Sequence, residues 1–223
     1  MTSAIGEILP LALGIAISPV PIIAAILMLL SPRARVTSVG FLLGWVLGIV
    51  VAVTVFTLLS SVIPEDDPDA SKPIQGTVQL ILGLLLLVLA LGQWRKRPKA
   101  GEEPVMPKWM RAIDKVSFPV ALGLGFLLSA VNPKNLLMAV GAGVEIGSAE
   151  LAMGESVGVI AVFTLLAAST VLVPVVGYLL AADRLRGALD ALRGWLSQNN
   201  AIIMAVLLLV IGVSMIGKGI AAF

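Results

Sequence analysis

Six long apolar runs constrain the fold of this chain more than any other feature. A helix that crosses the ~30 Å hydrocarbon core of a bilayer needs ~20 apolar residues, and each run is about that long or longer. Helix is the expected state because an open strand cannot satisfy its backbone hydrogen bonds in lipid. The expected spans are Ile5–Leu30, Val36–Ile63, Ile74–Trp94, Phe118–Val140, Ser156–Ala181 and Ala201–Ala221. The sequence therefore predicts an all-α polytopic membrane protein with six transmembrane helices.

The composition narrows the chemistry that such a protein can perform. Hydrophobic residues make up 59% of the chain and charged residues 13%, and there is no cysteine and no histidine. These absences exclude disulfides, thiol redox chemistry, thiolate or imidazole metal sites and histidine acid–base catalysis. No carboxylate pair falls inside an expected span, so we expect no enzymatic activity, no cofactor and no metal. The net charge of +2 gives no indication of a nucleic-acid partner, and we expect none.

The charges between the runs predict the orientation. Twelve of the fifteen basic residues fall in the first, third and fifth connections, whereas the second and fourth connections are acidic. The basic residues are Arg33, Arg35, Arg95, Lys96, Arg97, Lys99, Lys108, Arg111, Lys115, Arg184, Arg186 and Arg193. The acidic residues are Glu65, Asp66, Asp67 and Asp69, then Glu145, Glu150 and Glu155. The positive-inside rule assigns the basic connections to the cytoplasm, so both termini should be extracytoplasmic.

Two polar breaks interrupt the first and fourth runs. The first is Ser18-Pro19-Val20-Pro21, and the second is Ser129-Ala130-Val131-Asn132-Pro133-Lys134-Asn135. Proline lacks an amide proton and clashes with the carbonyl four residues back, so each helix should kink or open there. Paired broken helices indicate the substrate site of a transporter. The residues expected at this site are Ser18, Pro19, Pro21, Ser129, Asn132, Pro133, Lys134 and Asn135.

The two breaks occupy corresponding places in two halves of the chain. A shift of 111 residues matches Ser18 with Ser129 and Gly14 with Gly125, although the prolines fall out of step. Three spans in each half make the second half enter the membrane from the opposite side, which predicts an inverted-topology repeat. The expected divisions are a first repeat at 1–94, a basic cytoplasmic connection at 95–117 and a second repeat at 118–223.

Several of these residues admit two interpretations. Lys134 either binds an anion or proton inside the membrane or reaches outward past the end of its span, and we favour the first because a charge at the bilayer centre is costly. Ser129 and Asn132 share a helical face, so they either act together on a substrate or bond between helices. Pro19 and Pro21 favour an unwound segment over a simple bend.

The remaining polar patterns concern packing and the membrane surface. Apolar residues at helical spacing predict an interfacial amphipathic helix at about 183–197, and 107–115 shows the same pattern more weakly. Gly40, Gly44 and Gly48 form a small-residue stripe that lets another helix approach closely. The default partner of this stripe lies within the same chain, and a homodimer is the alternative.

The two breaks also carry a resemblance to a known family. With Ile17-Ser18-Pro19-Val20-Pro21-Ile22, the Asn-Pro-Lys element of 129–136, the basic central connection and Pro174 in the fifth span, the chain resembles the LysE superfamily of small exporters. Within it, the chain is most similar to the glycopeptidolipid-addressing protein (GAP) family of actinobacteria, which includes the sulfolipid-addressing protein. The resemblance implies a plasma (inner) membrane protein that contacts membrane lipids and a larger lipid transporter.

Taken with this resemblance, the sequence predicts an exporter that moves a small amphiphile or cell-envelope glycolipid outward by alternating access. Two alternatives stay open. One is a non-transporting accessory or scaffold protein of a lipid-export complex, and the other is an exporter of amino acids or small metabolites.

Overall fold

The computed structural model describes residues 2–61, 73–97 and 116–223, and every regular element in these residues is an α-helix. The helices are α1 (Thr2–Ala16), α2 (Pro19–Leu30), α3 (Ala34–Ser61), α4 (Pro73–Arg95), α5 (Phe118–Ala130), α6 (Pro133–Gly147) and α7 (Met153–Ala221). The acidic residues of the second connection and the segment at 107–115 lie outside the described residues.

The number of candidate membrane spans agrees with an all-helical, multi-pass protein. Four stretches are long and apolar enough to cross a bilayer: α3, α4 and two parts of α7, Met153–Ala182 and Arg184–Ala221. Ala181 separates the two parts of α7 because its φ of −147° and ψ of 54° are not helical. Two bent helix pairs, α1 with α2 and α5 with α6, raise the count to six if each pair is one span.

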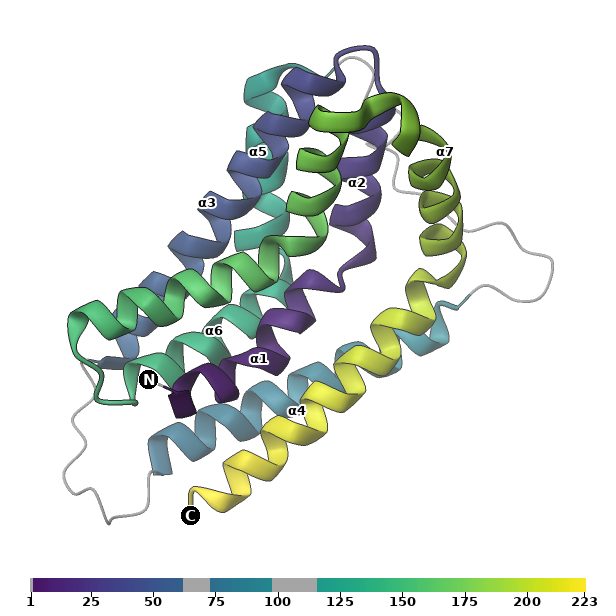
Figure 1. Ribbon diagram of the computed structural model, residues 1–223. Coiled ribbons are helices and arrows are strands. Elements are labelled where there is room, and N and C mark those ends of the chain that lie inside the picture. The colour runs from purple at the N-terminus through teal and green to yellow at the C-terminus, as the bar shows by residue number, and fades with distance from the viewer. Residues whose placement is uncertain (1, 62–72, 98–115) are drawn as a thin grey trace.

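Both chain termini lie at the same end of the helical bundle (Figure 1). The end of α3 and the α6–α7 connection are found there too, and we call this the termini end. An even number of crossings brings the two ends of a chain back to one side, which agrees with four spans and with six.

The glycine stripe on α3 lies against α5 within the same chain, as the default interpretation predicted (Figure 1). A side chain on Gly44 would overlap the backbone of Leu122, and one on Gly125 would overlap the backbone of Phe41. A second glycine contact joins α4 to the second part of α7. There Gly83 meets the backbone of Gly212 in an antiparallel crossing. Small residues thus let both helix pairs pack backbone to backbone.

Gly44→Ala should therefore destabilise the protein by about 3 kcal/mol or more, because the added methyl group meets rigid backbone rather than a movable side chain. Gly123→Ala is the matched control on α5, since a Cβ there has no neighbour within 4 Å. Thermal unfolding of both purified variants checks the prediction. Equal melting temperatures would show that α3 and α5 are not packed as described.

Two expected boundaries are corrected by the structure. The fourth run was expected to end at Val140, but α6 continues to Gly147 because Gly143 and Gly147 allow it to lie close against the end of α3. Residues 184–221 form one helix, so the amphipathic segment at about 183–197 is continuous with the sixth span. Its position along the membrane surface stays a prediction.

Candidate functional site: two broken helices joined by a buried lysine

The first break separates α1 from α2 by a bend of 53°. Ser18 is extended, with φ −97° and ψ 105°, and Pro19 is the first residue of α2. The last backbone bond at the end of α1 runs from Ile17 N to Leu13 O, at 2.9 Å. The carbonyl groups that follow lose their usual helical partners because the chain turns and Pro19 has no N–H to donate. They need donors from elsewhere in the protein.

Two side chains from the second half of the chain bond to these carbonyl groups. Lys134 Nζ donates to Gly14 O at 2.5 Å, and Thr170 Oγ1 donates to Ala16 O at 2.6 Å. Positive charge on this lysine is also favoured by the negative end of the α1 dipole. The C-terminus of α1 is therefore stabilised by residues of α6 and α7 rather than by its own chain neighbours.

The second break separates α5 from α6 by a bend of 60°. Asn132 is the N-cap of α6, and its Oδ1 accepts a hydrogen bond from Lys134 N at 3.1 Å. Pro133 follows as the first helical residue, where its missing N–H is no loss. Asn135 Nδ2 donates to Leu128 O at 2.8 Å, so this side chain provides a hydrogen-bond donor to one carbonyl near the end of α5. The polar residues of this break are thus largely used to terminate and restart a helix.

The structure brings the two predicted breaks together at Lys134 and assigns the predicted residues unequal roles. Ser129 gives its hydroxyl to its own helix, at 3.0 Å from both Gly125 O and Phe126 O. Ser18 makes no side-chain capping bond. Asn135 is fully buried, and its Oδ1 has no hydrogen-bond partner. The free acceptor of Asn135 is therefore the predicted polar atom best able to take a further donor.

Lys134 does not reach outward past the end of its span. Its side chain is 4% exposed and bonds to the interior carbonyl of Gly14. The end of α6 at Gly147 lies about 20 Å further along the helix at ~1.5 Å per residue. The alternative of an outward-reaching lysine rested on a span ending at Val140, and the longer helix removes it.

A second polar cluster lies at the termini end and was missed by the sequence analysis. Lys218 Nζ forms ion pairs with Glu7 and with Glu145, the latter at 3.1 Å, and Gln79 Nε2 donates to Glu145 at 3.0 Å. These four residues, which we call the Lys218 cluster, join α1, α4, α6 and α7. Glu145 was expected in a solvated loop, but its side chain is only 10% exposed. The signal that could have found this cluster is Lys218, a lone cation inside the sixth apolar run.

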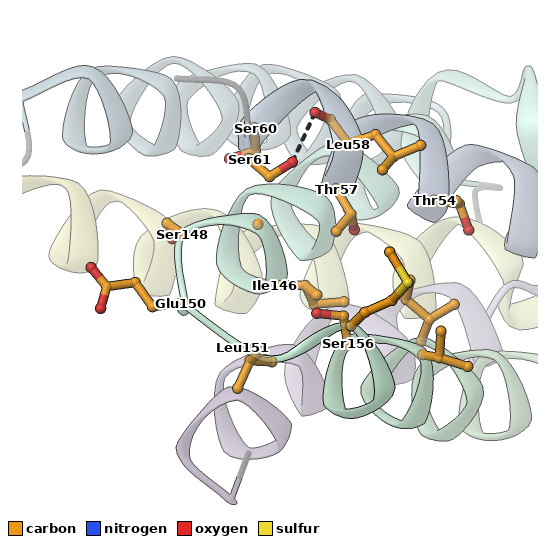
Figure 2. A pocket seen from close by; sticks show the side chains of 14 residues that line it. Thr54, Thr57, Leu58, Ser60, Ser61, Ile146, Ser148, Glu150, Leu151 and Ser156 are labelled. Carbon is orange, nitrogen blue, oxygen red and sulfur yellow. Dashed lines mark hydrogen bonds between the residues drawn. The ribbon is translucent and has the colours of Figure 1, made fainter. Parts of the chain in front are cut away.

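The termini end also holds an open groove between α3, α6 and the start of α7, with a volume of about 610 Å³ (Figure 2). Its lining mixes hydroxyl groups with apolar side chains. Lys134 and Asn135, by contrast, are covered by protein. The conformation described here therefore keeps the meeting point of the breaks closed and leaves the groove accessible.

These features define a multi-pass α-helical membrane protein whose two broken helices meet at a buried polar contact. The chain belongs to the family of Sap, the sulfolipid-1-addressing protein, whose sequence model matches residues 8–221. This match confirms the family resemblance carried by the two breaks, and membership implies a lipid-addressing membrane protein. No curated protein and no solved structure matches the chain.

Proposed function

We propose that the protein moves an amphiphile such as a cell-envelope glycolipid outward across the plasma membrane by alternating access. The observation that carries this proposal is the bond from Lys134 in the second half to Gly14 in the first half. A charged side chain buried at the contact between two broken helices is expensive in a bilayer and is the usual mark of a substrate or ion pathway. Family membership supports a lipid as the cargo.

The helix contacts support two inverted three-helix repeats. The second span, α3, packs on the fourth span, α5 with α6. The repeat maps spans one, two and three onto spans four, five and six. The counterpart of the contact between the second and fourth spans is therefore a contact between the fifth and first spans, and Thr170 bonds to Ala16 in that contact. The third and sixth spans, which the repeat maps onto each other, meet through Gly83 and Gly212. The same repeat relates the two breaks, so the halves would rock about the contact of Lys134 with Gly14.

The distribution of charge suggests how the cycle proceeds. The α2–α3 connection, which holds Arg33 and Arg35, lies at the end opposite the termini, as does the bend of α7 next to the arginines of 184–193 (Figure 1). Under the positive-inside rule we infer that the termini end is the outer one. The Lys218 cluster then joins first-half helices to second-half helices on the outer side. In our proposal these ion pairs break as the protein opens outward, and Lys134 exchanges the carbonyl of Gly14 for the polar group of the cargo.

Reconstitution of the purified protein alone tests the proposal. Vesicles of phosphatidylcholine that hold the protein should transfer a fluorescent glycolipid analogue between leaflets faster than empty vesicles do, as measured by quenching from outside. Transfer that equals the protein-free rate, with folded protein present in the bilayer, would remove the proposal of an autonomous carrier. Transfer of a labelled amino acid instead would favour the metabolite exporter.

One observation favours the accessory role as a second candidate. The segment at 184–197 exposes Leu192 and Trp195 beside exposed Arg184 and Arg186, a surface suited to anionic lipid or to a partner protein. A scaffold would leave vesicles inactive until the larger transporter is added. Replacing Trp195 and Leu192 by serine should then reduce recruitment of that transporter while the fold is unchanged.

A further inference from the structure

The groove at the termini end has an unusual lining for a membrane protein. It lies where α3 and α6 end and α7 begins, and side chains from opposite sides face the same space (Figure 2). Six of its lining residues carry hydroxyl groups, and they come from three different segments of the chain. They are Thr54, Thr57, Ser60, Ser61, Ser148 and Ser156. Hydroxyl groups converging on one space can exchange hydrogen bonds with a polar ligand.

Thr57 is the residue that most clearly indicates a ligand. It is 7% exposed, its Oγ1 has no hydrogen-bond partner, and it lines the groove. A buried hydroxyl without a partner is costly, and native structures rarely leave one without a reason. Two neighbours differ, since Ser61 donates to Leu58 O at 3.1 Å and Ser148 donates to Val144 O at 2.8 Å. Thr57 therefore has an uncommitted donor at the wall of the groove.

The charges of the lining select the type of ligand. Among the described residues that line the groove, Glu150 is the only ionisable one, and it is exposed. The described part of the lining holds no lysine or arginine, so it offers a sulfate or phosphate group no compensating charge. A neutral polyhydroxyl group can both donate to and accept from hydroxyl side chains. A volume of about 610 Å³ is within the range of small-ligand pockets.

Exposed apolar side chains border the hydroxyl groups. Leu58, Met153 and Val157 line the groove and are 61%, 86% and 61% exposed. In a bilayer this surface can take an alkyl chain while the hydroxyl groups hold a polar head. The groove therefore matches a molecule with one polar and one apolar end.

We propose that this groove binds the neutral sugar headgroup of an amphiphile, with Thr57 donating a hydrogen bond to it and with its alkyl chain on Leu58, Met153 and Val157. Its role as an exit site for cargo rests on the function proposed above, whereas its ligand class does not. The described lining offers no cation to an anionic headgroup, and Lys134 is where the proposal places such a group.

Photolabelling of the full chain in phosphatidylcholine nanodiscs tests the proposal. The probe is an alkyl β-glucoside with a diazirine in its chain, and the control probe has the same chain on a phosphocholine head. The glucoside should label peptides of 54–61 and 146–160, and octyl glucoside should compete. Thr57→Val should weaken competition about fivefold, the loss of one neutral hydrogen bond. Thr57→Ser should restore it, and Ser61→Ala, whose hydroxyl is already used, should have little effect.

Equal labelling by both probes, or unchanged competition in a folded Thr57→Val variant, would overturn the proposal. If Thr57→Val does not fold, Ser60→Ala and Ser156→Ala carry the same test, and unchanged competition in both overturns it. The binding test is separate from transport. Vesicles that transfer lipid without glucoside labelling would remove the groove and keep the carrier, whereas labelling without transfer would keep the groove and remove the carrier.

Discussion

Lys134→Met is expected to abolish transfer of the lipid analogue while leaving a folded protein in the membrane. Methionine has a similar length and no charge, so it fills the same space between α6 and α1. It removes the donor to Gly14 O, which costs about 1–3 kcal/mol when a buried acceptor is left without a partner. Part of this cost is offset because a buried charge is also removed. The effect on transport should therefore be far larger than the effect on stability.

Two further substitutions separate the charge of Lys134 from its hydrogen bond. Lys134→Gln keeps an N–H group that can reach toward Gly14 O, and it should fold normally yet transfer no lipid. Thr170→Val removes the neighbouring bond to Ala16 O without touching a charge, and it should slow transfer only severalfold. Leaflet transfer and melting temperature are measured on all three variants. Full transport in Lys134→Gln would mean that Lys134 is only a cap for the end of α1.

The breaks could be predicted from the sequence because their cause is local. A proline lacks its amide proton whatever surrounds it, so Pro19 and Pro133 indicate interrupted helices before any tertiary contact is known. The hydrogen bonds that complete the breaks are not local. Lys134 and Gly14 are 120 positions apart in sequence, and no periodicity within either span indicates that they meet. The existence of two broken helices was thus predictable, but their joining by a lysine was not.

Glu145 shows why the second polar cluster escaped prediction. In sequence it precedes Glu150 and Glu155, so the three residues resemble one acidic loop. The expected span ended at Val140, but Gly143 and Gly147 let α6 pack close against α3, and the helix continues past Glu145. The position of Glu145 within α6 then depends on contacts with α3 that only the folded chain supplies.

Lys218→Met is expected to be the most destabilising of the charge substitutions. It leaves Glu7 and Glu145 close together without their shared cation. Breaking a fully buried ion pair costs about 3–5 kcal/mol, and the partial exposure of Glu7 and Lys218 reduces this to about 2 kcal/mol. Thermal unfolding in nanodiscs measures the loss. Glu150→Gln, which removes an exposed carboxylate at the same end, is the matched control and should leave the melting temperature unchanged.

The loss in Lys218→Met should be reversible by removing the charge that lost its partner. The double variant Lys218→Met with Glu145→Gln should recover most of the stability, because glutamine can still bond to Gln79 without repelling Glu7. Acidic buffer should also recover it, since protonating Glu145 removes the repulsion. If the cluster joins the halves on the outer side, the closed state of the outer side should be less stable in the double variant. Its transfer rate should then change even though its melting temperature is restored, whereas a purely structural cluster would leave both at their original values.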